Sequence, residues 1–363
     1  MIYDLRKIQD GNITNKKVLL RADVDVPILN GQIQDESRLK AWFPTLEYLL
    51  KSQNTVFIVG HMGRPKQQFT ISNYQFSKEN EALSLKPVAQ WINNKLELHA
   101  ILEEIEVNGF KAFKTNGNVI ILENLRFFKE EEENDSGFSQ ELASLGEIYV
   151  NDAFASSHRA HASTEGITKF LPSFAGLRIQ KEVEELSKVL ENPTRPLAVI
   201  IGGAKIETKL PLVEKMHKFA DFVLVGGEIA ENDLILLKVQ HEQVPDRKSV
   251  LLVADLNAEL KDITPKSAEN FLQVLQGVAT IVWNGPMGLV EEAPYDLGTK
   301  TLTDGIVNIN AHKILGGGDT VSCIQKMGLL DKFNFVSIGG GAMLEFLSGE
   351  KLPGLIALEN NYK

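Results

Sequence analysis

Short apolar runs alternate with glycine turns and amphipathic stretches along most of this chain. The clearest example is the apolar run at 197–201, which ends in Gly202 and Gly203 and leads into an amphipathic stretch at 206–219. An apolar run of this length is typical of a buried strand, and apolar residues recurring at helical spacing predict a helix. The segment therefore predicts a strand, a tight turn and a helix.

The same alternation extends over both halves of the chain. Apolar runs predict strands at 17–26, 55–59, 119–122 and 148–150 in the first half, and at 198–201, 222–225, 250–253, 280–283, 313–315 and 335–338 in the second. Helical patterns lie between them, among them 36–51 and 83–95. Because strands that alternate with helices favour parallel sheets, we expect an α/β fold with two doubly wound, Rossmann-like parallel-sheet domains.

A junction rich in glycine and proline separates the two halves. It lies at 166–176. We expect one domain at 1–170 and a second at 171–344, with a connecting helix near 181–190. The tail at about 345–363 contains an apolar stretch and is expected to pack back on the first domain.

The composition narrows the class of protein. A formal net charge of −10 argues against a general nucleic-acid binder, because such a protein presents a basic surface. The single cysteine, Cys323, excludes an intrachain disulfide and fits a reducing compartment. No apolar run has the length of a membrane span and no signal-peptide pattern is visible, so we expect a cytoplasmic protein that binds no membrane. The acidic run at 130–135 is expected to be solvated surface and nothing more.

Three glycine-rich turns in the second half are candidates for phosphate binding. They lie at 202–203, 316–318 and 339–341, each between a predicted strand and a helical pattern. Backbone N–H groups at a helix start attract anions, and glycine lets a ligand approach them. Lys205 and Lys209 lie four residues apart, so both can project from one helix face. The alternative is an ordinary turn with two solvated lysines, and neither the P-loop motif nor the dinucleotide fingerprint is present.

Cationic side chains of the first half lie mostly near the ends of predicted strands. They are Arg21, Arg38, Arg64, Arg126 and Arg159, with His61, His158 and His161. Several guanidinium groups in one place suit a small substrate that carries phosphate and carboxylate groups. The spacing of His158 and His161 could instead suit zinc, but no cysteine accompanies them. Asp23 and Asp25 alternate with Arg21 on the predicted strand, and this charged face is expected to meet a polar ligand or another charged group, the alternative being a solvent-facing edge.

Motifs in both halves resemble those of phosphoglycerate kinase. In the first half they are 21–27 (Arg-Ala-Asp-Val-Asp-Val-Pro), 60–65 (Gly-His-Met-Gly-Arg-Pro), 122–127 (Leu-Glu-Asn-Leu-Arg-Phe) and 150–161. In the second half they are 202–205 (Gly-Gly-Ala-Lys), 282–288 (Val-Trp-Asn-Gly-Pro-Met-Gly), 316–320 (Gly-Gly-Gly-Asp-Thr) and 339–342 (Gly-Gly-Gly-Ala). Each motif is a weak signal alone, but their order makes the resemblance specific, and it covers nearly the whole chain.

The resemblance implies a two-domain enzyme with a deep cleft. It would transfer a phosphoryl group reversibly between ATP and the carboxylate of 3-phosphoglycerate, a step of glycolysis and gluconeogenesis, and would act as a monomer on small molecules. The implied substrate-binding residues are Asp23, Asp25, Arg38, His61, Arg64, Arg126 and Arg159. The implied nucleotide-binding residues are Gly203, Lys205, Lys209, Asn284, Glu291, Gly316, Gly317, Gly318, Asp319 and Thr320, with Mg²⁺ on Asp319 and ATP or ADP as its partner. The implied catalytic residues are Arg38, Lys205, Gly317 and Gly340.

The chain departs from the family pattern at several positions. Asp25 stands where the family has a neutral Asn, Glu228 where it has a small residue against the adenine, and Ile338 where it has Thr. The segment at 230–251 is also shorter than is usual in the family. These departures affect the nucleoside pocket more than the residues expected to handle the transferred charge. The alternative to an active kinase is a relative without activity that binds a phosphorylated acid as a sensor or scaffold.

Overall fold

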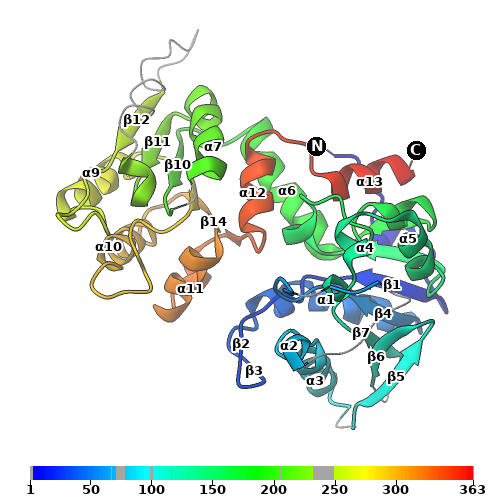
Figure 1. Cartoon of the computed structure of the whole chain (residues 1–363). Coiled ribbons are helices and arrows are strands. Elements are labelled where there is room, and N and C mark those ends of the chain that lie inside the picture. Colours follow the sequence, from blue (N-terminus) through cyan, green and yellow to red (C-terminus); the bar gives the residue numbers. More distant parts are fainter. Residues whose placement is uncertain are drawn as a thin grey trace. The chain divides into compact units, whose positions relative to one another are not determined.

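The structure is a computed structural model that describes residues 3–66, 68–70, 78–98, 101–115, 117–204, 206–231 and 249–362 (Figure 1). The chain divides into two compact units, one formed by Met1–Glu184 with Lys351–Lys363 and the other by Glu185–Glu350. The division lies inside the helix α6 (Leu177–Glu191) and not at residue 170, where the sequence placed it. Strand β9 (Ser173–Ala175) explains the difference, because it pairs with the sheet of the first unit.

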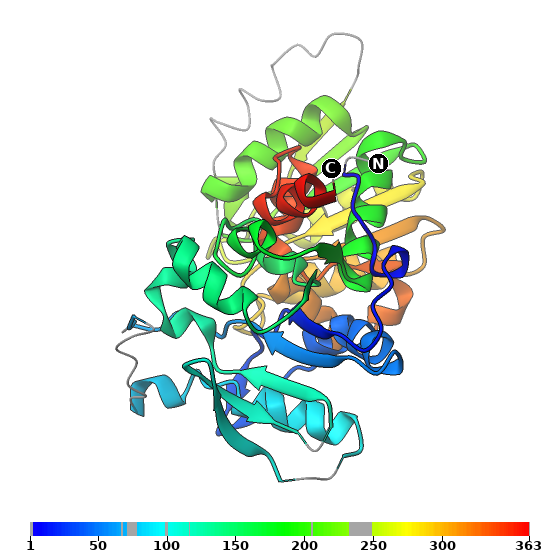
Figure 2. The same ribbon diagram turned by 90° about the vertical axis from the view of Figure 1, so that its right-hand side faces the viewer.

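The end of the chain returns to the first unit as the helix α13 (Pro353–Tyr362). The backbone N–H of Leu352 donates to the Tyr3 hydroxyl at 2.8 Å, and the Asn361 side chain donates to the Thr168 carbonyl at 2.7 Å. The two ends of the described chain accordingly lie near each other in both views (Figures 1 and 2). The helix α12 (Gly340–Leu347) contacts α7 (Ile206–Phe219) in the second unit, so the returning segment begins at Lys351 and not at 345.

The first unit contains a seven-stranded sheet with the order β5-β6-β7-β4-β1-β8-β9. Its remaining strands are β1 (Lys17–Arg21), β4 (Thr55–Val59), β5 (Glu103–Val107), β6 (Phe110–Lys114), β7 (Val119–Leu122) and β8 (Ile148–Asn151). The neighbouring strands in the part β7-β4-β1-β8-β9 pair in parallel, whereas β6 pairs antiparallel with both β5 and β7. The α/β class is confirmed, but this sheet is mixed and not purely parallel as predicted.

The strand β1 is shorter than the sequence predicted. It ends at Arg21, which pairs with Val59 at the end of β4 and with Asn151 at the end of β8. Because both neighbouring strands end there, no ladder remains for residues 22–26. The predicted strand at 17–26 was therefore wrong beyond Arg21, and Asp23 and Asp25 lie on a connecting loop.

The helices of the first unit include α1 (Ser37–Lys51), α2 (Lys78–Glu81), α3 (Lys86–Lys95), α4 (Lys129–Glu132) and α5 (Ser136–Ala143). Of these, α1, α3 and α5 bury apolar residues. Trp42 and Leu46 of α1 are fully buried and belong to one apolar cluster with Val18 and Leu20 of β1. This packing fixes the start of α1, and with it Arg38, beside the carboxyl end of β1. A small hairpin of β2 (Ile28–Leu29) and β3 (Gln32–Ile33) precedes α1.

The second unit contains a six-stranded parallel sheet with the order β12-β11-β10-β13-β14-β15 (Figure 1). Its strands are β10 (Leu197–Ile201), β11 (Phe222–Val225), β12 (Val250–Val253), β13 (Thr280–Asn284), β14 (His312–Gly316) and β15 (Phe335–Val336). Besides α7 and α12, its helices are α9 (Pro265–Leu275), α10 (Leu297–Ile306) and α11 (Gly318–Lys326). All its strand pairs are parallel, as the sequence predicted. None of the helices in the described ranges is long and apolar enough to cross a membrane.

Candidate functional site

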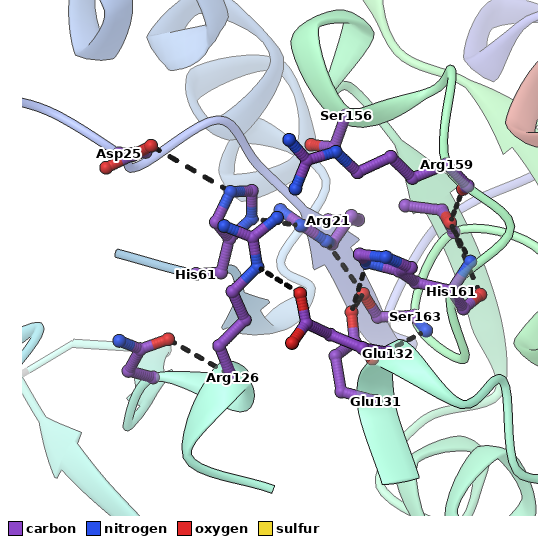
Figure 3. Close-up of polar contacts among 12 residues, drawn as sticks. Arg21, Asp25, His61, Arg126, Glu131, Glu132, Ser156, Arg159, His161 and Ser163 are labelled. Carbon is purple, nitrogen blue, oxygen red and sulfur yellow. Dashed lines mark hydrogen bonds and ion pairs between the residues drawn. The ribbon is translucent and has the colours of Figure 1, made fainter. Parts of the chain in front are cut away.

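Four loops at the carboxyl edge of the first sheet bring cationic side chains together (Figure 3). Arg21 ends β1 and His61 lies just after β4. Arg126 lies in η3 (Leu125–Phe127), directly after β7, and Arg159 follows β8. The carboxyl ends of parallel strands share one edge of a sheet, which is why residues far apart in the sequence meet here. We call Arg38, His61, Arg126 and Arg159 the cationic cluster.

Arg126 is the clearest sign that the cationic cluster is built for an anion. The residue is 2% exposed, and its Nη1 donates to the Gly63 carbonyl at 2.7 Å. Its Nε and Nη2 are buried and make no hydrogen bond within the described residues, although Nε lies 3.5 Å from a Glu132 carboxylate oxygen. Buried donors without acceptors are costly, so a ligand with acceptor oxygens is the natural partner of this guanidinium.

Arg38 and Asp25 lie at the outer side of the cationic cluster. Arg38, in the first turn of α1, donates from Nη1 to the Asp25 backbone carbonyl. The Asp25 carboxylate accepts from the Gly63 N–H at 3.0 Å, and its other oxygen lies 3.9 Å from both Arg38 Nη1 and His61 Nε2. The carboxylate of Asp25 therefore already faces Arg38 and His61, two side chains that are expected to bind the substrate.

Arg21 and Asp23 are buried parts of the framework and do not lie open to a ligand. Both Asp23 oxygens accept hydrogen bonds, from Ala155 N at 2.8 Å and from Ser156 Oγ at 2.9 Å. Arg21 is fully buried, and each of its guanidinium nitrogens has a partner within the protein. Among the predicted neighbours of this charged face, the solvent-facing edge is wrong for Arg21, which lies buried against His61 and is linked to Glu131 through Ser163.

Glu131 is the residue that the sequence analysis missed. It belongs to the acidic run expected to be solvated, yet it is fully buried, and its carboxylate accepts from Ser163 Oγ at 2.6 Å and from Ser163 N at 2.9 Å. One signal could have found it: Glu131 lies three residues after the buried Phe128, on the same side of α4. Burial raises the pKa of Glu131, and Arg21 opposes that shift.

The histidines after β8 do not form a metal site. The described residues include no group of three or more His, Cys, Asp or Glu side chains that could hold a metal ion. Arg159 Nε donates to His158 Nε2 at 3.2 Å, and burial, followed by Arg21, lowers the pKa of His161 to about 4. The zinc alternative is therefore not supported within the described part of the chain. Arg64 lies exposed on the turn after β4.

The second candidate region is the carboxyl edge of the second sheet. Here the turns after β10, β11 and β13 approach one another so closely that a Cβ would overlap the neighbouring backbone, and the turn after β14 lies beside them. A Cβ at Gly285 would overlap the Gly202 carbonyl, and one at Gly227 would lie 2.5 Å from the Gly203 nitrogen. Gly203 and Gly317 have φ angles of 89° and 90°, which L side chains rarely adopt. Gly316 ends β14, and Gly340 begins α12 with its Cβ position 3.4 Å from the Gly317 Cα.

Polar groups at this glycine-rich edge point to a phosphate ligand. The Thr320 hydroxyl, in the first turn of α11, is fully buried and makes no hydrogen bond within the described residues. Asp319 beside it is exposed, and Asn284 is buried at the end of β13. Lys209 is 7% exposed, and its ammonium donates to the Gly202 carbonyl. The start of α11 thus combines a helix N-terminus with a buried hydroxyl that lacks an acceptor.

Three residues that the sequence placed near the nucleotide make no contact in the described part of this edge. Lys205 lies outside the described residues, so the predicted pairing of Lys205 and Lys209 on one face is not tested. Glu291 and Glu228 are both exposed. Since the Glu228 carboxylate lies in solvent, it carries no desolvation cost in this structure.

Comparisons with known proteins give the same family for both halves of the chain. The family profile of phosphoglycerate kinase matches residues 8–249 and 233–350. A phosphoglycerate kinase from Moorella thermoacetica is 38% identical over 395 aligned positions, covering 97% of this chain and 98% of that protein. One from Coprothermobacter proteolyticus is 37% identical over 401 positions, covering 98% of each.

Solved structures give the same result. Phosphoglycerate kinase from Coxiella burnetii is similar with a TM-score of 0.80 and 31% identity, covering 99% of this chain and all of that one (100%). The enzyme from Pyrococcus horikoshii has a TM-score of 0.82 and 28% identity, covering 99% of each chain. The two profile matches overlap at 233–249, within the segment identified as shortened. These findings give no support to an inactive binding protein or to a dinucleotide oxidoreductase. The chain belongs to the phosphoglycerate kinase family, whose members are phosphotransferases.

Proposed function

We propose that the chain transfers a phosphoryl group reversibly between ATP and the carboxylate of 3-phosphoglycerate, giving ADP and 1,3-bisphosphoglycerate. The observation that carries this proposal is the cationic cluster with the unsatisfied donors of Arg126. An acid that bears both a carboxylate and a phosphate supplies several acceptor oxygens to such a cluster. The family match gives the reaction class.

The first unit would hold 3-phosphoglycerate. Arg126 and Arg159 offer guanidinium donors, and His61 offers its Nε2 side, which faces Asp25. Arg38 and the exposed Arg64 reach the same edge from α1 and from the turn after β4. Asp23 holds the loop at 155–156 through its two hydrogen bonds, so it would position that loop beside the substrate hydroxyl.

The second unit would hold the nucleotide. Gly203, Gly316, Gly317 and Gly318 would present backbone N–H groups to the phosphates, with Lys205 and Lys209 as countercharges. Asn284 and Glu291 would lie along the nucleotide, and Gly340 would lie against the transferring group beside Gly317.

The same edge suits Mg²⁺. A magnesium ion in a phosphotransferase takes one or two carboxylates and completes its shell with water and substrate phosphates. Asp319, exposed at the start of α11, supplies one such carboxylate, and the Thr320 hydroxyl lies beside it. When bound, Mg²⁺ would neutralise the phosphate oxygens of the nucleotide.

Phosphoryl transfer to this carboxylate requires positively charged groups in fixed positions and no general base. The accepting carboxylate is already ionised at neutral pH, so no proton has to be removed before it attacks. Arg38 and Lys205 would neutralise the charge that spreads over the transferring group, as preorganised donors do in phosphoryl transfer. Because acceptor and donor bind to separate units, transfer requires the two half-sites to meet and to exclude water.

The proposal includes a monomeric enzyme that acts on small molecules without nucleic acid or membrane, and the net charge of −10 supports the absence of a nucleic-acid partner. The acidic composition and the single, buried Cys323 support a cytoplasmic location.

A coupled assay tests the proposal. Purified protein with ATP, Mg²⁺ and 3-phosphoglycerate should turn over at rates ordinary for kinases, on the order of 1–100 per second. Arg38→Ala should reduce kcat by about 10² or more with an unchanged melting curve, because it removes one preorganised donor. Binding of both ligands without turnover in the wild type would refute the proposal in favour of a binding protein.

A further inference from the structure

We propose that Arg21 is a positioning residue that holds the His61 ring in its neutral form with the proton on Nε2. His61 then always presents a hydrogen-bond donor to an anion bound at the cationic cluster. The proposal deepens the function proposed above and rests on it only for the identity of the acceptor, which would be an oxygen of 3-phosphoglycerate.

The contact between the two side chains selects one form of the ring. Arg21 Nη2 lies 2.8 Å from His61 Nδ1 (Figure 3). A guanidinium has only donors and keeps its proton in proteins, so Nδ1 must accept through its lone pair. An imidazolium, or the tautomer with the proton on Nδ1, would place two N–H groups against each other at this distance. The remaining form carries its proton on Nε2.

Arg21 cannot turn away from His61, because its other nitrogens are also engaged. Nε donates to Ser163 Oγ at 2.8 Å, and Nη1 donates to the Ala22 carbonyl at 2.6 Å. Ser163 Oγ in turn donates to Glu131, and the Tyr149 hydroxyl donates to the Ser163 carbonyl at 2.6 Å. Arg21, Ser163, Glu131 and Tyr149 are all fully buried. Each of the three guanidinium nitrogens of Arg21 therefore has a partner, so the hydrogen-bond network fixes the orientation of the guanidinium.

The other charged groups around His61 also disfavour its protonation. Two guanidinium groups lie near the ring, those of Arg38 in α1 and Arg159 in the loop after β8, and the His161 ring of the same loop is a further neighbour. The Asp25 carboxylate faces the ring, at 3.9 Å from Nε2. Burial, followed by Arg21, holds the pKa of His61 well below its usual range despite Asp25.

The fixed form of His61 has a consequence for binding. The Nε2–H group points to the side of Asp25, so a substrate oxygen bound there accepts a hydrogen bond and takes up no proton from the ring. Affinity for 3-phosphoglycerate should therefore not follow a histidine titration, even though a histidine lies in the site. A histidine that bound the substrate as an imidazolium would instead bind it more tightly as the pH falls.

The ring form can be measured directly by nitrogen NMR. The chain has seven histidines, and His61 is assigned by comparison with His61→Asn. In wild-type protein labelled with ¹⁵N at histidine, His61 should show a bare Nδ1 and a protonated Nε2 from about pH 5.5 to about pH 8. A protonated Nδ1, or an imidazolium in this range, would overturn the proposal. Because this measurement needs no turnover, failure of the proposed reaction and failure of this inference are separate results.

Two variants then test whether Arg21 is the cause. Glu131→Gln keeps Arg21 and is the matched control for Arg21→Met combined with Glu131→Gln, which removes the arginine without leaving a buried carboxylate unpaired. In the control His61 should keep the wild-type form. In the double variant Nδ1 loses the donor that faces it, so the His61 ring should populate the tautomer with the proton on Nδ1 or the imidazolium. A ring that stays neutral with its proton on Nε2 would refute the role of Arg21. If the double variant does not fold, the spectra of wild type and control still decide the form of the ring.

The pH dependence of KM for 3-phosphoglycerate separates positioning from a general structural effect. The substrate phosphate titrates as well, but it cancels in the ratio of KM between the double variant and the control. A loss of packing would change this ratio by one factor at every pH. Where loss of Arg21 lets the ring become an imidazolium, the ratio should fall by about fivefold between about pH 8 and about pH 6, because the imidazolium binds the anion. A constant ratio together with a ring that keeps its proton on Nε2 in the double variant would overturn the proposal.

Discussion

Among single residues, Asp25 has the clearest effect to predict on substrate affinity. Its carboxylate lies 3.9 Å from Arg38 Nη1 and from His61 Nε2, so it competes with an incoming anion for the same donors. In Asp25→Asn the amide oxygen can still accept from Gly63 N–H, while the negative charge is lost. We expect KM for 3-phosphoglycerate to fall by about tenfold, which corresponds to about 1.4 kcal/mol.

Glu147→Gln is the matched control for Asp25→Asn. It removes the same charge at the opposite edge of the sheet, where Glu147 pairs with Lys16 at 2.8 Å. KM for 3-phosphoglycerate should be unchanged in this control. If Asp25→Asn leaves KM unchanged or raises it, Asp25 supports Arg38 and His61 and does not compete with the substrate.

Asp152 should make stability depend on pH. It lies just after β8, is fully buried, and accepts from Arg178 N at 2.8 Å and Ile179 N at 3.0 Å in the first turn of α6. Burial raises the pKa of Asp152 to about 7 from its usual 3.8. A carboxyl with a raised pKa in the folded protein stabilises it most below the unfolded pKa, and this contribution is lost as the pH rises through about 7.

Asp152→Asn should remove that contribution. As the pH rises from about 4 to about 7, the free energy of unfolding of the wild type should fall relative to that of the variant, by at most about 4 kcal/mol. Denaturant unfolding of both proteins at several pH values measures the difference, and other buried carboxyls cancel in the comparison. A difference that is independent of pH would mean that Asp152 stays ionised in the folded protein.

Among the structural elements, the turn between β14 and α11 gives a pair of neighbouring glycines with opposite expectations. Gly317 has a φ of 90°, and a Cβ there would lie 3.2 Å from the Gly285 nitrogen. Gly318 begins α11, has no positive φ, and has nothing within 4 Å of its Cβ position. Gly317→Ala should therefore lower the free energy of unfolding by about 1–3 kcal/mol, whereas Gly318→Ala should leave it within about 0.5 kcal/mol. Equal melting curves for the two variants would contradict the strain at Gly317.

At the scale of the whole molecule, each half-site is built within one of the two units. The cationic cluster draws its contacts from the first unit, and the glycine-rich edge from the second. Arg126→Met should therefore weaken 3-phosphoglycerate binding at least tenfold and leave ATP binding unchanged. Thr320→Val should do the reverse. Calorimetry with each ligand separately measures both affinities, and loss of both ligands in either variant would show that the half-sites are not independent.

The sequence by itself determined the family, the α/β class and the edges at which the chemistry lies. Apolar runs predict buried strands locally, and in a parallel sheet the residues that follow such strands share one edge. Arg126 and Thr320 could therefore be placed near these edges without coordinates, and the resemblance to the family implied that they bind ligands. The hairpin of β5 and β6 was missed, although Asn108 and Gly109 form a dipeptide that such turns favour and have φ angles of 50° and 83°.

Only the tertiary structure decided which charged residues are buried. Arg21 and Glu131 look like a ligand and a surface charge in the sequence, yet they form one fully buried network through Ser163. Likewise β1 ends at Arg21 because β4 and β8 end beside it, and not because its own residues stop favouring a strand. Burial and strand length depend on neighbours that are remote in the sequence, so a local pattern cannot specify them.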